Sequence, residues 1–169
     1  RPAEDELGTR VVIEGSRVKL QETVACAEGS SLSVRNLFFN VPARRQFLKS
    51  DSVELKHVID EFQRVALAHP EIAFDLLHND NEIHRMPAGQ ERQRIVHVFG
   101  RKYEERLVPV EEATDFVSVQ GFVGKPEFAK RTRGEQFFFV NRRFIRSNYL
   151  EHAVRKAYNE LLARDNYPS

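Results

Sequence analysis

The feature that most constrains the fold is an amphipathic stretch over residues 52–68 that a proline ends and an alternating stretch follows. Its apolar residues recur at helical spacing and predict one buried face: Leu55, Val58, Ile59, Phe62, Val65 and Ala66. His69-Pro70 ends the helix, because a residue before proline avoids helical backbone angles. Residues 72–76 then alternate as a strand, and residues 82–86 return as its hairpin partner. A helix joined directly to a hairpin predicts an α+β chain.

The first fifty residues predict short strands and a short helix. Residues 9–14 and 17–23 are predicted strands, with a turn at Gly15-Ser16. Residues 31–39 are predicted to be a third strand that enters a buried junction, because they become continuously apolar near their end. Residues 43–49 are a predicted short helix with Pro42 near its start.

A second unit is predicted after residues 86–90, which place a Pro and a Gly between two patterned stretches. A helix over 91–99 is expected to turn Ile95, Val96 and Phe99 inward, and a last helix is expected from Asn148 with a buried stripe ending at Leu161. The predicted strands lie between these helices, at residues 107–110, 116–123, 136–140 and 143–145. We therefore expect two α+β domains, residues 1–88 and 89–169. Thirteen Phe and no Trp predict a Phe-rich core.

The sequence lacks the common patterns of catalytic and metal sites. Its six His residues have no metal-ligand spacing, and one Cys builds no thiolate zinc site. No Walker-type phosphate loop and no nucleophile elbow are present. No apolar run reaches the roughly 20 residues that span a bilayer. We therefore assign no catalytic residue and no metal ligand, and expect no membrane partner.

A basic cluster is the main positive signal for binding. Residues 125–146 hold seven cations and two anions, a net charge of +5 in a chain whose total is +1. Such a cluster fits a nucleic-acid backbone. It equally fits a solvated edge that keeps the β-prone residues 136–140 from aggregating. The cations are Lys125, Lys130, Arg131, Arg133, Arg142, Arg143 and Arg146.

Three stretches resemble motifs of one known family. Residues 29–49, GSSLSVRNLFFNVPARRQFLK, resemble the signature G-T-x-x-x-V-x-x-L-F-x-N-x-P-A-R-x-x-F-L of the MutL/PMS family of DNA mismatch repair proteins. Residues 136–145, QFFFVNRRFI, resemble its F-V-N-x-R strand and turn, and residues 64–70, RVALAHP, its helix end. The resemblance covers nearly the whole chain and implies an internal part of the family's N-terminal region.

The resemblance implies both a fold and a function. Residues 1–88 would be the C-terminal part of a GHKL-type ATPase α/β sandwich, and residues 89–169 a truncated transducer domain similar to domain 2 of ribosomal protein S5. The parent would couple ATP binding and hydrolysis to dimer closure, DNA binding and recruitment of repair partners. The alternatives are an S5-like nucleic-acid-binding module or a protein-interaction module without an ATPase role, and the signature at 38–44 argues against the first of them.

The same resemblance implies what this chain lacks. The family's E-N-S-x-D-A helix, D-N-G-x-G-I loop and G-F-R-G-E-A-L lid do not occur in it. The parent would be a weak ATPase that binds ATP with Mg²⁺, whereas this chain alone is expected to hold neither and to be inactive, because hydrolysis needs a base and phosphate neutralisation. Implied partners are DNA, a MutS-type mismatch recognition protein, downstream repair enzymes and a second parent subunit. The implied location is the bacterial cytoplasm, at the nucleoid.

Several site residues follow from the matched motifs. Ser30 replaces the Thr of the family's Gly-Thr motif, and either contacts nucleotide in the parent or simply opens a strand after Gly29. Arg143 matches the motif Arg implicated in DNA binding. Arg142 replaces a usual Gly, which adds charge but disfavours a left-handed turn. Residues of the expected structural motif are Asn40, Pro42, Arg44 and Arg45. Arg44 and Arg45 would brace the domain or its lid by charged hydrogen bonds that fix the turn after Pro42, and the alternative for them is direct phosphate contact.

Overall fold

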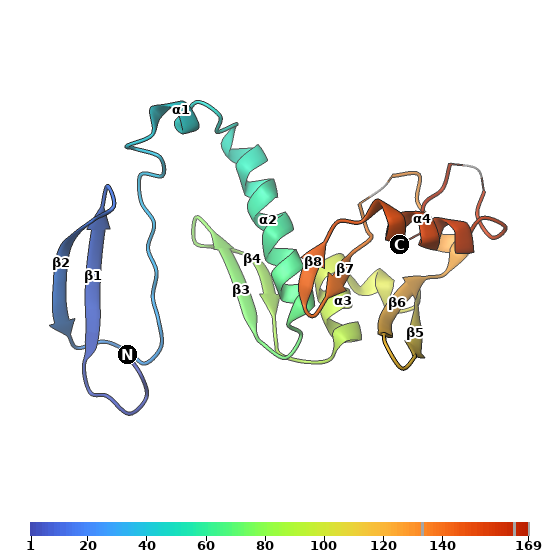
Figure 1. The fold of residues 1–169 in the computed structure, drawn as a ribbon, viewed down its shortest axis with the longest axis horizontal. Coiled ribbons are helices and arrows are strands. Elements are labelled where there is room, and N and C mark those ends of the chain that lie inside the picture. The colour runs from blue at the N-terminus through green and yellow to red at the C-terminus, as the bar shows by residue number, and fades with distance from the viewer. Residues whose placement is uncertain (133, 164, 169) are drawn as a thin grey trace. The chain divides into compact units, whose positions relative to one another are not determined.

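The computed structural model describes residues 1–132, 134–163 and 165–168, and it has both helices and antiparallel hairpins (Figure 1). The α+β prediction is therefore confirmed. The chain forms two compact units, Arg1–Glu54 and Leu55–Ser169, so their division falls in the first turn of the long helix. The expected division near residue 88 into two family domains stays a prediction.

The first unit is built on one hairpin. Strand β1 (Gly8–Glu14) pairs antiparallel with β2 (Arg17–Val24), with a bulge between Val12 and Ile13. The turn residues Gly15 and Ser16 both have positive φ, +53° and +65°, as a two-residue hairpin turn requires. Both predicted strands are confirmed to within a residue at either end.

The predicted strand over residues 31–39 is wrong. These residues adopt no helix or strand, and residues 36–40 form successive turns in which the Phe39 amide donates to the Asn36 carbonyl at 3.0 Å. No described residue pairs with them as a strand, and Leu32 is 92% exposed, so the expected buried junction is also absent. The short helix α1 covers only Pro42–Arg45, with Pro42 at its start as predicted.

Helix α2 (Asp51–Ala68) forms as the periodicity predicted, and all but its first turn belongs to the second unit. Strands β3 (Phe74–His78) and β4 (Asn81–Met86) form the expected hairpin, two residues later than predicted at its start. Helix α3 (Glu91–Phe99) follows within the predicted bounds. Its start is a reciprocal capping box between Gln90 and Gln93.

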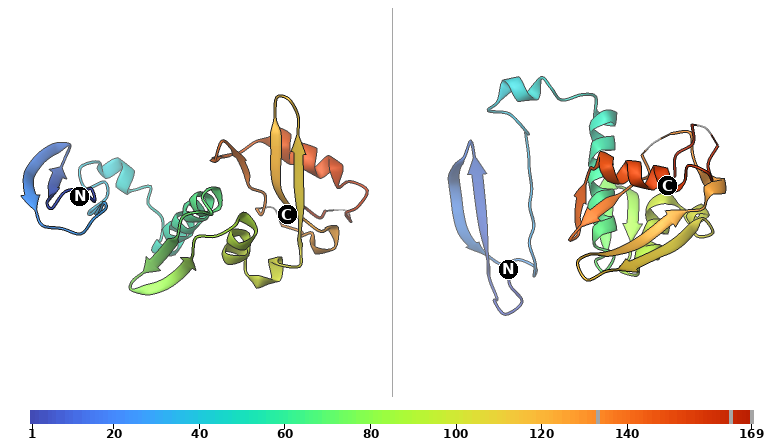
Figure 2. Two further views of the ribbon diagram at one scale, coloured as in Figure 1. Left: turned by 90° about the horizontal axis from the view of Figure 1, so that it is seen from below. Right: turned by 45° about the vertical axis from the view of Figure 1, so that its right-hand side comes forward.

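Two further hairpins and a helix complete this unit. A 3₁₀ turn (Arg101–Tyr103) precedes β5 (Leu107–Ala113) and β6 (Ser118–Gly124), and a second one (Pro126–Phe128) leads to β7 (Phe138–Val140) and β8 (Arg143–Ile145). Helix α4 (Asn148–Ala157) lies against the β5–β6 hairpin (Figure 2), where the Tyr158 hydroxyl donates to the Gly124 carbonyl at 2.7 Å.

The core of the second unit joins the end of α2, the β3–β4 hairpin, α3 and β7. Ala66, Leu67, Met86 and Val98 are buried together, and Phe side chains pack against them. The predicted Phe-rich core is confirmed, because its rings contact one another with centroid distances of 5.5 to 6.0 Å. The packed rings are Phe62, Phe74, Phe99, Phe137, Phe139 and Phe144.

Two predicted apolar faces differ from the structure. In α3 the buried residues are Arg94 and Val98, whereas Ile95, Val96 and Phe99 are half-buried. In α4 none of the predicted stripe is buried, and Leu161 lies beyond the helix end with 63% of its surface exposed. Helical periodicity identified the apolar residues, but it does not say how much of the neighbouring protein covers them.

Candidate nucleic-acid interface and nucleotide-facing loop

The β7–β8 hairpin positions the residues of the predicted DNA-binding turn. Its turn residues Asn141 and Arg142 have φ of +49° and +64°, the left-handed pair of a type I′ turn. Phe139 and Phe144 pair across the strands and pack ring to ring at 5.9 Å, while Arg143 points its side chain to solvent. The hairpin therefore uses its Phe residues for packing and leaves its arginines outside.

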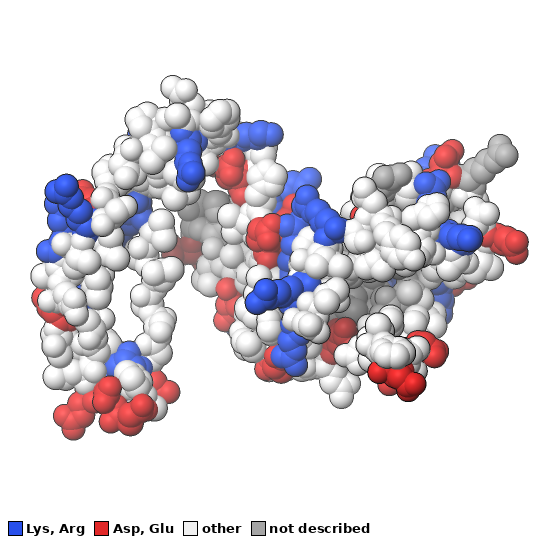
Figure 3. Space-filling model, in the orientation of Figure 1, with Lys and Arg blue, Asp and Glu red and all other residues white. Residues whose placement is uncertain are grey.

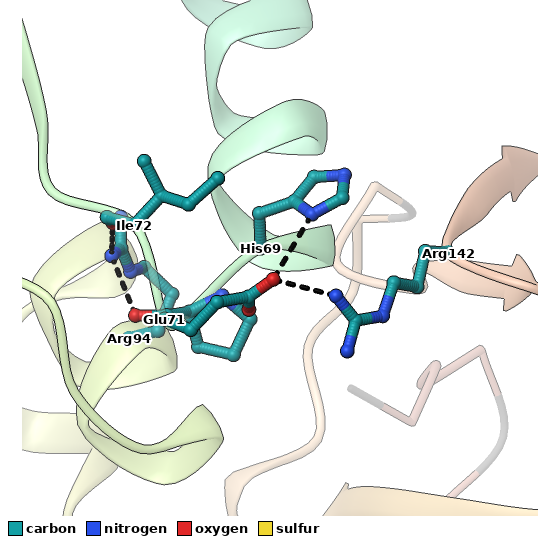
Figure 4. A network of polar contacts seen from close by, with 6 residues as sticks. His69, Glu71, Ile72, Arg94 and Arg142 are labelled. Atoms are coloured by element: carbon teal, nitrogen blue, oxygen red, sulfur yellow. Dashed lines mark hydrogen bonds and ion pairs between the residues drawn. The ribbon is translucent and has the colours of Figure 1, made fainter. Parts of the chain in front are cut away.

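Arg142 is held by a carboxylate from another part of the same unit. Its Nη1 donates to Oε1 of Glu71 at 2.6 Å, and His69 Nδ1 lies 3.4 Å from that oxygen (Figure 4). The pKa of Glu71 is lowered overall: a hydrogen bond from its own backbone lowers it most, burial raises it, and His69 and Arg142 lower it further. The turn therefore keeps a non-glycine residue in a left-handed conformation, with its charge partly neutralised.

Arg94 anchors the loop that carries Glu71, and the sequence prediction missed it. Its guanidinium is buried, and Nη2 donates to the carbonyls of Pro70, Ile72 and Pro87 at 3.0, 2.5 and 3.1 Å. It also lies 5.3 Å from the centre of the Phe74 ring. The sequence signal was a cation four residues before Val98 on the buried face of α3.

The Lys130 ammonium contacts a polar cluster of the protein. Its Nζ forms an ion pair with Glu135 and donates to the Tyr103 hydroxyl at 3.0 Å, and that hydroxyl donates to Glu135 at 2.5 Å. Hydrogen bonds to Glu135 and Tyr103 raise the pKa of Lys130. Burial, together with the hydrogen bond to Glu135, raises the pKa of Tyr103. This arrangement favours a structural role for Lys130.

The remaining predicted cations differ in whether the structure describes them as exposed and without an ion-pair partner. Arg131, Arg143 and Arg146 are exposed, and none forms an ion pair with a residue that the structure describes. Arg133 lies outside the described residues. Lys and Arg side chains gather beside the β7–β8 hairpin, whereas Asp and Glu side chains cover the tip of the β5–β6 hairpin (Figure 3). The structure thus separates free arginines from paired ones within the predicted cluster.

Ser30 borders a cavity in the first unit. The cavity is wide open to solvent and has a volume of about 480 Å³, and Asp5, Thr9 and Ser30 are among the residues that line it. Gly29, with φ of +101°, fixes the bend before Ser30, and its amide donates to the Arg1 carbonyl at 2.9 Å. Hydroxyl and carboxylate groups there suit hydrogen bonds to a base or a sugar. The assignment of Ser30 to nucleotide stays a prediction.

The residues predicted to brace the signature turn lie on the surface of the first unit. Pro42 starts α1, and Asn40 lies in the preceding turn. Arg44 and Arg45 are exposed and form no ion pair within the described part of the chain. Phe38 has a positive φ of +64°, which is uncommon for an aromatic residue. The bracing role of the two arginines stays a prediction.

The described residues contain no cluster of metal-ligand side chains and no helix that could cross a membrane. Over 1–132, 134–163 and 165–168, no three His, Cys, Asp or Glu side chains gather as metal ligands. In those ranges, none of the helices combines the length and the apolar character that crossing a bilayer demands.

Comparison with known proteins identifies relatives along nearly the whole sequence. Residues 95–169 match the family described as DNA mismatch repair protein, C-terminal domain. The chain is 59% identical over 165 residues to the DNA mismatch repair protein MutL of Christiangramia forsetii, and 60% identical over 166 residues to that of Flavobacterium johnsoniae. Each match covers 98% of this chain, but the chain spans only 27% and 26% of the two relatives.

The fold has the same relatives. The Aquifex aeolicus MutL ATPase domain complexed with ADP superposes with a TM-score of 0.73 at 25% identity, over 90% of this chain and 59% of that one. Another structure of the ATPase domain from A. aeolicus MutL gives a TM-score of 0.75 over 96% of this chain. Sequence identity near 60% over almost every residue, together with this shared fold, shows that the chain belongs to the MutL family of DNA mismatch repair proteins.

Proposed function

We propose that this chain is the part of a mismatch repair ATPase that presents a DNA-facing basic hairpin. The observation that carries the proposal is the β7–β8 hairpin, which exposes Arg143, with Arg146 next to it. Arg142 and Lys130, in contrast, form ion pairs with Glu71 and Glu135. Free arginines next to paired ones supply the charge that phosphates need. The whole protein couples ATP binding and hydrolysis to dimer closure and to recruitment of a MutS-type protein and later repair enzymes, in the bacterial cytoplasm at the nucleoid.

The charge distribution of the second unit supports an oriented contact with DNA. The β5–β6 hairpin, residues 107–124, contains three acidic residues and no Lys or Arg. Phosphates are repelled from that hairpin and attracted to the arginines of β8 and the following loop. Contacts of this kind hold the DNA backbone without reading its sequence.

The first unit contributes one nucleotide-facing position to the parent. A related MutL ATPase domain has been solved with ADP, and Ser30 borders a cavity lined by hydrogen-bonding groups. We assign the Ser30 hydroxyl a hydrogen bond to the nucleotide or to the group that reads its base. The parent's Mg²⁺ would neutralise phosphate charge during hydrolysis, and the family's E-N-S-x-D-A helix, which would hold it, does not occur in this sequence. Residues 1–88 and 89–169 are then parts of the ATPase and transducer domains.

The DNA proposal is tested in the full-length protein with Arg143→Glu/Arg146→Glu. The expected result is a loss of at least about tenfold in DNA affinity at low salt, with a salt slope smaller by about 1 for each lost contact. The matched control is Lys56→Glu, because Lys56 is an exposed cation about 12 Å along α2 from Arg64, the residue that packs over the Phe144 ring. Equal affinities for the wild type and the double variant would refute the proposal.

The nucleotide proposal has its own test. Ser30→Ala in the full-length protein is expected to weaken ATP binding about two- to tenfold, the cost of one hydrogen bond. Ser30→Thr restores the family residue and is expected to retain binding. Ser33→Ala, an exposed serine of the same segment, is the control. ATP affinity that is the same in the Ser30→Ala and Ser33→Ala variants would remove Ser30 from the site. The 169-residue chain alone is expected to show no ATP turnover.

A further inference from the structure

One arginine of the β7–β8 hairpin already has an anionic ligand within the chain. The Arg142 Nη1 donates to the Glu71 Oε1 at 2.6 Å, and the two side chains lie at the surface, 66% and 48% exposed. Arg142 occupies the turn of the hairpin, immediately before Arg143, which is exposed and forms no ion pair with a described residue. Two neighbouring arginines of one hairpin therefore differ in whether a carboxylate neutralises them.

Glu71 is held beside the turn by the structure of its own loop. It lies in the short segment between α2 and β3. Buried Arg94 donates hydrogen bonds to the carbonyls of Pro70 and Ile72, the residues on either side of Glu71 in the sequence (Figure 4). Because this loop is already fixed, bringing the carboxylate to Arg142 costs little further conformational entropy.

A carboxylate and a DNA phosphate bind a guanidinium in the same way. Both accept charge-assisted hydrogen bonds from its N–H groups, and its positive charge attracts both. A phosphate that approaches Arg142 therefore also meets the negative charge of Glu71, and the pair offers the phosphate little net attraction. An exposed ion pair of this kind is weak, so Glu71 lowers the contribution of Arg142 to phosphate binding without abolishing it.

We propose that Glu71 competes with DNA phosphate for Arg142 and so holds the affinity of the β7–β8 hairpin for DNA below the value that its arginines allow. The inference rests on the proposed DNA contact of Arg143 and Arg146, and it adds an autoinhibitory contact within the chain. Removal of the Glu71 charge leaves Arg142 as one further free cation at the turn. One added phosphate contact releases further counterions, so the salt slope of DNA binding becomes steeper by about 1.

The experiment is a double-mutant cycle on DNA affinity in the full-length protein. A fluorescent mixed-sequence duplex is titrated over a series of salt concentrations. Glu71→Gln keeps the size of the side chain but removes its charge, and it is expected to strengthen binding about three- to tenfold at low salt, with the steeper salt slope. Arg142→Gln alone is expected to weaken binding by at most about twofold, whereas in the Glu71→Gln background it is expected to remove the gain.

The matched control is Glu82→Gln, because Glu82 is another exposed carboxylate that pairs with an arginine. Its Oε2 lies 2.8 Å from the Arg85 Nη2, next to the turn of the β3–β4 hairpin and at the other end of that hairpin from the loop that holds Glu71. The substitution changes the net charge by the same amount and frees a cation in the same way, but it leaves Arg142 paired. It is expected to change DNA affinity by less than about twofold.

The outcomes separate this inference from the function it rests on. If Glu71→Gln weakens binding, Glu71 positions Arg142 for DNA and competition is refuted. An equal gain in Glu71→Gln and Glu82→Gln would reduce the effect to net charge and also refute competition. If Arg143→Glu/Arg146→Glu weakens binding while Glu71→Gln leaves it unchanged, the DNA contact stands without the autoinhibitory contact. If neither variant changes the affinity, the proposed function fails as well. Misfolding would weaken binding, so it cannot produce the expected gain.

Discussion

Arg142 and Glu71 lie 71 residues apart in the sequence, and the Arg142 Nη1 donates to the Glu71 Oε1 at 2.6 Å (Figure 4). This contact fastens the β7–β8 turn to the loop after α2. Buried Arg94 fixes the same loop, because its guanidinium donates hydrogen bonds to the carbonyls of Pro70 and Ile72. The hairpin that exposes Arg143 packs on the core through its Phe side chains, and one surface carboxylate and one buried guanidinium link its turn to the same unit.

The turn conformation of Arg142 gives the first prediction. Its φ of +64° is unfavourable for any residue with a Cβ. Arg142→Gly and Arg142→Ala both remove the ion pair, but only Gly also relieves the backbone. Urea unfolding is expected to show the Gly variant more stable than the Ala variant by about 1 kcal/mol. Equal stability of the two variants would mean that the turn is not left-handed at this position.

Removal of the Arg94 guanidinium is predicted to be far more damaging than removal of a surface cation. Arg94→Met removes three hydrogen bonds to carbonyls, of which only that of Pro70 keeps another donor, the Gly89 amide, and the expected cost is about 2–4 kcal/mol in the free energy of unfolding. Arg85→Met is the control, because Arg85 is exposed and its ion pairs are worth less than about 1 kcal/mol. Similar unfolding midpoints for the two variants in urea would contradict the anchoring role.

The parts of the fold that local signals specify were predictable from sequence. Helix α2 follows from apolar periodicity and a stop at Pro70, and the turn at residues 15–16 follows from small side chains that tolerate positive φ. Asn141 favours positive φ in the same way, whereas Arg142 adopts it against the expectation for an arginine. Residues 31–39 failed because a strand needs a pairing partner, which apolar composition does not supply. Helix α4 was predicted too long, since its apolar residues continue to Leu161 beyond the last helical hydrogen bonds.

Only part of the candidate site could be predicted, because the charge of a segment can be read from its sequence whereas the ion-pair partners of its side chains cannot. The sequence identified the basic cluster of residues 125–146. It gave no sign that Lys130 would meet Tyr103 and Glu135, or that Arg142 would meet Glu71, because these contacts depend on the packed core. Which arginines stay free for a ligand is therefore a property of the tertiary structure.

The Lys130–Glu135 pair is predicted to stabilise the protein only between acid and alkaline limits. Burial alone would raise the pKa of Glu135, but hydrogen bonds from Lys130 and Tyr103 lower it overall, below its ordinary 4.5. Its contribution is therefore complete above about pH 4.5 and is lost as the pH falls further. The pKa of Lys130 is raised above 10.5, so its contribution is lost as the pH rises through that raised value.

Glu135→Gln tests this pair. The variant is expected to unfold at lower urea concentration at neutral pH and to lose less additional stability than the wild type below about pH 4.5. Glu127→Gln changes an exposed carboxylate of the same segment and is the control. An unchanged acid dependence of stability in Glu135→Gln would show that the carboxylate is not engaged in the folded protein.

His84 is predicted to weaken the fold on mild acidification. Its ring stacks on Phe62 with centroids 5.8 Å apart and an interplanar angle of 7°, and burial lowers its pKa below the ordinary 6.5. The unfolded chain then takes up a proton first as the pH falls through 6.5, so stability declines from that point towards the folded pKa.

His84→Phe keeps an aromatic ring against Phe62 but has no proton to gain. Urea midpoints measured at about pH 7.5 and pH 5.5 are expected to differ less in this variant than in the wild type. The control is His152→Gln, at an exposed position, which is expected to keep the wild-type difference between the two urea midpoints. If His84→Phe showed that same difference, His84 would titrate alike in the folded and unfolded chain.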